Sequence, residues 1–216
     1  MTAVVVKIGG GVLGVPGAFE AVCAAVGALG RRERVVVVPG GGPLADAVRS
    51  LDRRLDLSAD TAHWMAILAM DQYAQVLAER IDGATLVEDS GAVAGTLASG
   101  RIAVLAPSRW LRAADPLPHS WDATSDSLSV FLAVALDAGR LVLVKPADVG
   151  EAGVDPDFAR VAPEGLEVSV VGWERFVAAC QDTAAFRTRR DAGFGLPIPS
   201  DSSADSSSAR TGRLKK

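Results

Sequence analysis

Two glycine-rich segments constrain this chain more than any other feature, because each directly follows an apolar run. The first run, VVVKI, ends in Gly9, Gly10 and Gly11, and the second, VVVVP, ends in Gly40, Gly41 and Gly42. Valine runs of this length are typical of buried strands, and a helical pattern follows each glycine segment. Glycine lets the backbone approach a ligand closely, and a helix N-terminus offers unpaired N–H groups to anions. The sequence therefore predicts two phosphate-binding loops at one edge of a sheet.

Strand-like and helix-like segments alternate along the rest of the chain. This alternation predicts an α/β three-layer sandwich with a central, mostly parallel sheet. Strands are expected at residues 3–8, 34–38, 85–87, 102–105, 141–144 and 167–171. Helices are expected at residues 17–29, 43–55, 59–81, 125–138 and 173–180. The unbroken apolar character of the second and fifth strands indicates that both faces of each are buried.

The composition changes near residue 186. A charge run at residues 187–191 is followed by a Gly/Pro-rich stretch and then by a segment of almost only Ser and Asp. Such a composition cannot bury a core. We therefore expect one folded domain at residues 1–185 and a disordered Ser/Gly/Pro-rich tail at residues 186–216.

Charge and hydropathy exclude several classes of partner. The 216-residue chain has a net charge of −4 and no basic stripe, which argues against nucleic acid. No apolar run approaches the roughly 18 residues that a membrane span needs, so a cytoplasmic enzyme is the default expectation. Cys23 and Cys180 have no second Cys or His at ligand spacing, so we expect two buried thiols and no metal site.

The first glycine segment can also be interpreted as a dinucleotide fingerprint, because residues 9–14 satisfy G-x-G-x-x-G after a strand. That fingerprint expects an acidic residue at the end of the second strand to hold the ribose. Here the second strand ends in Val38, Pro39 and Gly40, without an acid. A G-x-x-x-x-G-K-[ST] loop is also absent from the sequence. A dinucleotide oxidoreductase is therefore the less favoured interpretation.

Two lysines at strand ends favour phosphate chemistry instead. Lys7 lies two residues before the first glycines, and Lys145 follows the apolar run of residues 141–144. Burying an unpaired ammonium group is costly, so a lysine in such a strand needs an anionic partner. Phosphoryl transfer mainly needs positive charge and backbone donors around the phosphate oxygens. We expect Lys7 to contact the transferring phosphate and to contribute little to folding.

A third motif, Thr124-Ser125-Asp126, precedes the helix expected at residues 125–138. In one interpretation Thr124 or Ser125 caps the helix and Asp126 complements its dipole. In the other, Asp126 points back into the cleft and organises the lysines or a metal-bound phosphate. The two interpretations are compatible.

Together these motifs resemble the amino acid kinase superfamily, which includes acetylglutamate kinase, aspartokinase, carbamate kinase and bacterial uridylate kinase. The resemblance spans residues 1 to about 150 and implies a kinase that uses ATP and Mg²⁺. It implies that Lys7 and Lys145 stabilise the transferring phosphoryl group and that Asp126 orients Lys7. It also implies that Gly9 to Gly11 hold the donor phosphates and that the segment with Asp148 and Val149 lines the nucleotide site.

Within this superfamily, the segment from Trp121 to Ser127 looks most like the branch that phosphorylates an aminomethyl-furanmethanol phosphate in methanofuran synthesis. A small phosphorylated acceptor would then bind Gly40, Gly41, Gly42, Thr124 and Ser125. Relatives continue from the second lysine into a Val-Asp-Gly turn, whereas this chain continues Val149-Gly150-Glu151, so we expect a shortened nucleotide lobe. A uridylate kinase-like enzyme and a non-catalytic nucleotide- or oxyanion-binding member of the fold remain alternatives.

The helix expected at residues 59–81 carries an apolar stripe on one face. A second set of residues on it, beginning with Trp64 and Leu68, grades from apolar to polar like an interface rim. Members of the resembled superfamily commonly pair through the corresponding helix. Together these features predict a homo-oligomer, either a dimer or a hexamer. Trp64 and Leu68 could instead lie under the strand near Thr85 in a monomer.

Five further side chains are of interest. His63 and His119 are expected to be structural, and Trp121 either stacks on a furan or packs in the core. Asp89 and Asp122 are candidates to pair with a substrate ammonium group.

Overall fold

A six-stranded parallel sheet forms the centre of the molecule. The structure is a computed structural model that describes residues 2–148 and 153–182. The strands are β1 (Val4–Ile8), β2 (Val35–Pro39), β3 (Ala84–Val87), β4 (Ile102–Leu105), β5 (Arg140–Lys145) and β6 (Glu167–Gly172). Their order is β3-β4-β2-β1-β5-β6, and all five pairings are parallel. All six expected strands are confirmed, and β2 is buried throughout its length.

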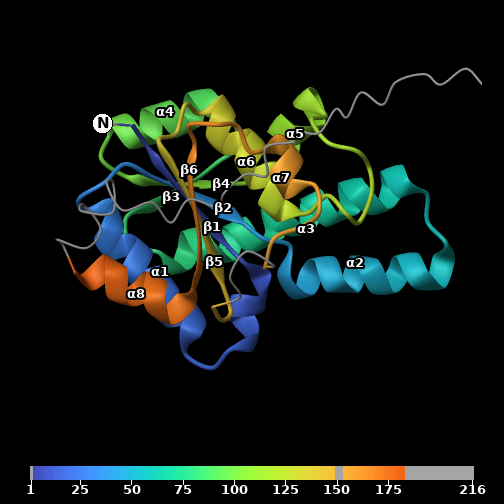
Figure 1. Cartoon of the computed structure of the whole chain (residues 1–216), viewed down its shortest axis with the longest axis horizontal. Helices are drawn as coiled ribbons and strands as arrows, with labels where there is room; N and C mark the ends of the chain where they lie inside the picture. The colour runs from blue at the N-terminus through green and yellow to red at the C-terminus, as the bar shows by residue number, and fades with distance from the viewer. Residues whose placement is uncertain (1, 149–152, 183–216) are drawn as a thin grey trace, which may run out of the picture.

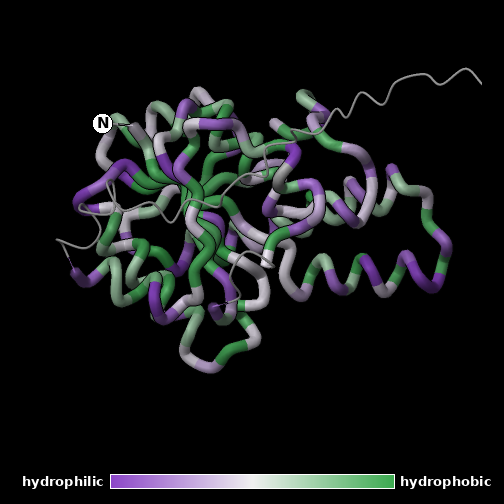
Figure 2. The backbone as a smooth tube through the Cα atoms, viewed as in Figure 1, coloured by the Kyte–Doolittle hydropathy of each residue, from purple (hydrophilic) through white to green (hydrophobic). Residues whose placement is uncertain are grey.

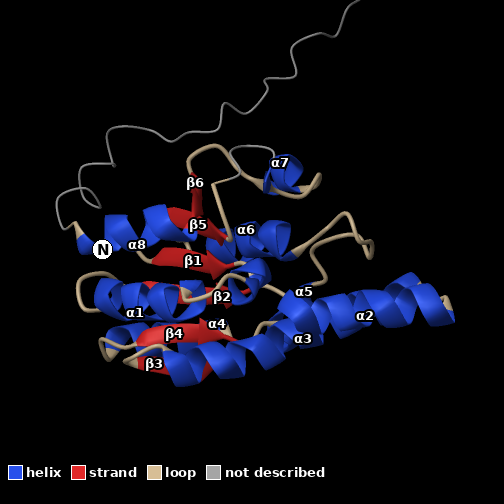
Figure 3. Cartoon of the chain, turned by 90° about the horizontal axis from the view of Figure 1, so that it is seen from below, coloured by secondary structure: helices blue, strands red, loops and turns tan. Residues whose placement is uncertain are grey.

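Helices cover both faces of this sheet, which confirms the α/β three-layer architecture (Figures 1 and 3). They are η1 (Gly10–Gly14), α1 (Ala18–Gly30), α2 (Gly42–Leu55), α3 (Ala59–Arg80), α4 (Ser90–Ala98), α5 (Ser108–Ala114), α6 (Ser125–Ala135), α7 (Phe158–Val161) and α8 (Trp173–Gln181). Helices α1 and α8 and the second half of α3 pack on one face. Helices α4, α5, α6 and α7 and the first half of α3 pack on the other.

The side-chain alternation of β1 directs Lys7 toward α6. Val4, Val6 and Ile8 belong to the core under α1 and α8, whereas Val5 belongs to the core under α6. Successive side chains of a strand point to opposite faces of the sheet. Lys7 therefore lies on the same face as Val5, near the carboxyl end of an otherwise apolar strand.

The expected helices are present, but α4, α5, α7 and the 3₁₀ helix η1 were not predicted. Helix α4 has the sequence SGAVAGTLA, whose small residues give it almost no hydrophobic period. Its N-cap is Asp89, whose Oδ1 accepts a hydrogen bond from Ala92 N at 2.9 Å. Asp89, which the sequence suggested as a partner for a substrate ammonium group, therefore caps a helix.

Helices α2 and α3 form an antiparallel hairpin that extends beyond the carboxyl ends of the strands (Figure 1). Ser58 caps α3 by accepting a hydrogen bond from Thr61 N. The expected stripe on α3 is buried at Ile67, Met70, Ala74, Leu77 and Ile81. Figure 2 shows polar residues along much of the α2 arm and apolar residues in the sheet.

Both cysteines are buried and free, as expected. Burial raises the pKa of each thiol to about 12, so both remain neutral near neutral pH. Among the described residues, no helix is both long and apolar enough to cross a membrane.

Candidate active site

The two glycine loops meet at the carboxyl edge of β1 and β2. Gly9 N donates to Val144 O at 2.9 Å, and Gly40 N donates to Ile8 O at 2.8 Å. Gly10, Gly11, Gly41 and Gly42 line a cavity beside them, but Gly9 and Gly40 do not. Four of the six glycines that the sequence suggested for phosphate binding therefore line the cavity. The first glycine of each loop instead fixes the loop to a neighbouring strand.

The two loops also form one unit instead of two separate cradles. A Cβ atom on Gly10 would lie 2.0 Å from Gly42 Cα and 2.2 Å from Gly42 N, which are backbone atoms of the other loop. Gly42 has a φ of +56°, a conformation that glycine adopts without strain. The loops therefore present a continuous surface of backbone to the cavity.

Lys7, Asp126 and Lys145 meet at the inner end of this cavity. Lys7 Nζ lies 2.7 Å from Asp126 Oδ1, and Lys145 Nζ lies 2.5 Å from Asp126 Oδ2. Lys7 and Asp126 are both buried, with exposed fractions of 4% and 3%. No other lysine occurs in the described part of the chain. One carboxylate thus orients two ammonium groups and leaves the trio with a net charge of about +1, suited to an anion.

Burial and charge act in opposite directions on this trio. Burial by itself would raise the pKa of Asp126, but the charges of Lys7 and Lys145 outweigh it and hold that pKa below its ordinary value. Burial lowers the pKa of Lys7, and Asp126 opposes this shift. Because Lys7 belongs to a buried ion pair, removing it would leave the buried Asp126 with a single cationic partner, so we now expect its loss to affect folding as well.

The N-terminus of α6 positions Asp126. Thr124 is the N-cap, and its Oγ1 accepts a hydrogen bond from Asp126 N at 3.2 Å. Asp126 at the same time points to the two lysines, so both interpretations of this motif hold. Thr124 and Ser125 line the cavity.

Asp155 is a buried residue of this site that the sequence analysis missed. Its carboxylate accepts hydrogen bonds from Thr124 N at 3.1 Å, Thr124 Oγ1 at 2.6 Å and Ser127 N at 3.1 Å, and also from Ser127 Oγ. It therefore accepts hydrogen bonds from donors at the N-terminus of α6 that have no partner within the helix. In sequence, Asp155 is followed by Pro156 in a segment without periodicity, a pattern typical of an ordinary turn.

We expect Asp155→Asn to lower the free energy of unfolding by about 1–3 kcal/mol, because an amide cannot accept from all four donors. Without these hydrogen bonds the first turn of α6 should also shift, which would displace Asp126 and lower activity. Thermal unfolding and initial rates measure the two effects. Asp82→Asn is the control, since the side chain of Asp82 is 91% exposed. Equal stability of the two variants would contradict this role of Asp155.

The cavity has a volume of about 510 Å³ and lies between the glycine loops, α6 and the α2–α3 hairpin. Its outer part is lined by Arg49, Asp52, Asp56, His63 and Trp121. Trp121 Nε1 donates to Asp52 Oδ2 at 2.7 Å, and the Arg49 guanidinium lies 4.7 Å from the centre of the Trp121 ring. Trp121 thus forms a wall of the cavity and is not a core residue.

Some of the residues selected from sequence lie elsewhere. Asp89 and Asp122 are not among the residues that line the cavity. Asp148 is exposed, and its Oδ1 accepts a hydrogen bond from Gly172 N at 2.7 Å, just before α8. Val149, also expected at the nucleotide site, and the tail at residues 186–216 lie outside the described residues.

The residues present fit a triphosphate better than a bare magnesium ion. Lys7 and Lys145 would hold phosphate oxygens, and η1 and α2 begin with N–H groups that lack intrahelical partners. Asp126 is already paired with two lysines, so a magnesium ion here would rely mainly on phosphate oxygens and water, as Mg²⁺ commonly does.

The fold and this site define an α/β protein with a buried lysine–aspartate–lysine cluster and two glycine loops at the carboxyl edge of its parallel sheet. The chain belongs to the amino acid kinase family, whose model matches residues 2–149. Its sequence is similar to that of the [5-(aminomethyl)furan-3-yl]methyl phosphate kinase of Methanocaldococcus jannaschii, with 34% identity over 116 residues. That match covers 54% of this chain and 53% of the relative, so the chain matches about half the length of this curated protein.

Solved structures with the same fold include uridylate kinases. The Archaeoglobus fulgidus uridylate kinase has a TM-score of 0.53 at 19% identity, over 68% of this chain and 64% of that one. The UMP kinases of Ureaplasma parvum and Bacillus anthracis each have a TM-score of 0.55, at 14% and 15% identity. These matches cover 68% of this chain and 70% and 66% of theirs. The partial coverage fits the expected shortening of the nucleotide lobe.

Proposed function

We propose that this protein is an ATP-dependent kinase whose acceptor is itself a small phosphomonoester. The observation that carries the proposal is the pair of lysines held by Asp126 beside a continuous glycine surface. Such a site supplies the positive charge and backbone donors that phosphoryl transfer requires. The similarity to the [5-(aminomethyl)furan-3-yl]methyl phosphate kinase supports an aminomethyl-furanmethanol phosphate in methanofuran synthesis as the acceptor.

The outer cavity supports an acceptor with both a phosphate and an amine. Arg49 offers a guanidinium group to an anion, while Asp52 and Asp56 offer carboxylates to an ammonium group. Trp121 provides a flat wall for a small ring. A nucleoside monophosphate also contains a phosphate and a ring, so a uridylate kinase-like activity is the alternative.

In this proposal Lys7 and Lys145 hold the transferring phosphoryl group, and Asp126 keeps their ammonium groups oriented. Gly10 and Gly11 would contact the phosphates of ATP, and Gly41, Gly42, Thr124 and Ser125 those of the acceptor. Bound Mg²⁺ would neutralise charge on the ATP phosphates. No general base is required, because the oxygen of an acceptor phosphate is already ionised.

Coupled measurement of ADP release tests the proposal. We expect ADP formation from MgATP to depend on [5-(aminomethyl)furan-3-yl]methyl phosphate, with lower kcat/KM for UMP. A higher kcat/KM for UMP would favour the uridylate kinase-like alternative. Binding of ATP without ADP formation under either condition would instead favour a non-catalytic member of the family.

We also propose that the α2–α3 hairpin mediates homo-oligomerisation, as a dimer or a hexamer. Within its own chain Trp64 contacts the rings of His63 and His119 and the guanidinium group of Arg112. Large apolar side chains nevertheless remain exposed on the hairpin: Leu44, Leu51, Leu55, Leu68 and Val76. Leu44, Leu51 and Leu55 are seven and four residues apart on α2 and so share one face of that helix, as at a surface that a partner covers.

Light scattering should give a mass of at least two chains at low micromolar concentration. Leu68→Glu should dissociate the assembly, because a carboxylate would be buried at the interface. Val134→Glu is the matched control, since Val134 is 50% exposed on α6, away from the hairpin. A single-chain mass for the unmodified protein would refute this assembly.

A further inference from the structure

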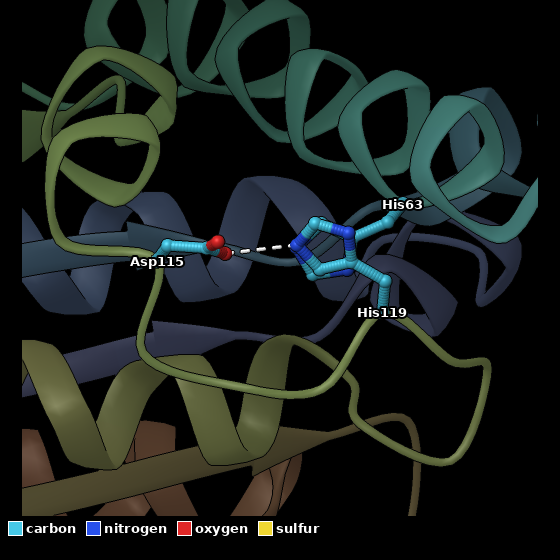
Figure 4. A group of neighbouring side chains, drawn as sticks. All are labelled: His63, Asp115 and His119. Atoms are coloured by element: carbon cyan, nitrogen blue, oxygen red, sulfur yellow. Dashed lines mark hydrogen bonds and ion pairs between the residues drawn. The ribbon is translucent and has the colours of Figure 1, made fainter.

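Both histidines of the chain meet at one wall of the cavity, together with a carboxylate. His63 comes from α3, whereas Asp115 and His119 come from the loop after α5. The imidazole rings are stacked, with centroids 4.0 Å apart and 17° between their planes. Figure 4 shows the two rings lying over each other and the carboxylate of Asp115 directed toward them. The ligand atoms of all three side chains lie within 4.8 Å of one another.

A fourth residue completes an arrangement that is common around protein-bound metals. His119 Nδ1 lies 2.6 Å from Asp60 Oδ1, and His119 Nε2 lies 2.8 Å from Asp115 Oδ1. Histidines that bind a metal through one nitrogen usually donate the other N–H to a carboxylate, which fixes the ring. Asp60 holds His119 in this way and directs Nε2 toward Asp115.

We propose that His63, Asp115 and His119 bind one divalent transition-metal ion, with zinc as the expected ion. Two imidazole nitrogens and one carboxylate oxygen are a preferred ligand set for Zn²⁺ and its neighbours in the first row. Mg²⁺ and Ca²⁺ prefer oxygen ligands and are disfavoured here. The site is separate from Lys7, Asp126 and Lys145, so it does not depend on the proposed kinase activity.

Binding exchanges a proton for the ion. Carboxylates accept hydrogen bonds, so with both nitrogens facing carboxylates the ion-free His119 ring carries a proton on each. The ion replaces the proton between Nε2 and Asp115, which is released to solvent. Each metal–nitrogen bond lies in the plane of its ring, so binding must also increase the 17° angle between the two planes.

The ion would link two parts of the cavity wall. His63 itself lines the cavity, and His119 is separated by one residue from Trp121, which also lines it. A metal ion at this place joins α3 to the loop that carries Trp121. We therefore expect binding to stabilise the fold and the outer end of the cavity.

The test uses the full, untagged chain after treatment with a chelator. Calorimetric titration with ZnCl₂ should show one saturable site per chain, and the melting temperature should rise. Co²⁺ should bind at the same site and give the absorption of a low-coordinate ion, whereas equal concentrations of Mg²⁺ should not compete. Because the chain has only two histidines, imidazole NMR should show both shifting with a single equivalent of Zn²⁺.

Variants assign the binding to these residues. Asp60→Asn should weaken zinc binding by about 10–100-fold, and His63→Gln, His119→Gln and Asp115→Asn should weaken it further. Asp115 has a side chain that is 55% exposed, so its variant is expected to fold even if a histidine variant does not. Asp82→Asn, at a side chain that is 91% exposed, is the control and should bind normally. Absence of saturable Zn²⁺ and Co²⁺ binding, or unchanged affinity in Asp115→Asn, would overturn the proposal.

Discussion

Replacing Lys7 with alanine is expected to lower kcat by about 10²–10³-fold, the usual cost of removing one preorganised donor from a developing charge. Lys7 is one of only two described lysines, and both contact the same carboxylate. Without Lys7, the phosphoryl group would lose one of its two cationic contacts, and Asp126 would be held by Lys145 alone. Initial rates of ADP release at saturating substrates measure the loss.

Stability must be measured with activity for this variant. Because Lys7 is buried against Asp126, we expect its removal to lower the free energy of unfolding by about 1–3 kcal/mol. Rates should therefore be taken at a temperature where circular dichroism shows the variant folded. Arg31→Ala is the control, because Arg31 and its partner Asp82 are largely exposed. A folded Lys7→Ala protein with unchanged kcat would refute the role of Lys7 in transfer.

A Cβ atom at Gly10 is expected to reduce kcat/KM for ATP and for the acceptor together, by about 10²-fold. The new atom would meet the backbone of Gly42 at 2.0 Å, so one loop must move away from the other. A displacement of about 1 Å at a site that positions reacting groups can cost a rate factor of this size. Since the two loops form one surface, kcat/KM should fall for both substrates.

Gly14→Ala provides the matched control for Gly10→Ala. Gly14 lies in the same 3₁₀ helix, and a Cβ atom there has no neighbour within 4 Å. Its kinetic constants should equal those of the unmodified protein. If Gly10→Ala raises the KM of only one substrate, the loops act independently and our interpretation of their contact is wrong.

Helix α4 and Asp155 show where prediction from the sequence failed. Helix α4 is rich in glycine and alanine, so its short apolar face leaves no periodic signal, and Asp89 had no recognisable helix to cap. Asp155 lies 28 residues after Ser127 in the sequence, and its carboxylate accepts hydrogen bonds from the backbone N–H and the hydroxyl of Ser127. A carboxylate that acts over such a separation is indistinguishable from a turn residue until the chain is folded.

The sequence by itself determined the sheet and indicated the two lysines that we propose contact phosphate. Valine runs need two covered faces, and Lys7 within such a run needs an anion, so strands and lysines could both be recognised locally. Only the tertiary structure decided how distant residues combine. The contact of Gly10 with Gly42, the meeting of Lys7 and Lys145 on Asp126, and the stacking of His63 on His119 join residues that are 19 to 119 positions apart in the sequence. The parallel sheet brings the carboxyl ends of its strands to one edge, and the α2–α3 hairpin brings His63 to the loop of His119. These contacts therefore depend on strand order and helix packing, which no local sequence pattern encodes.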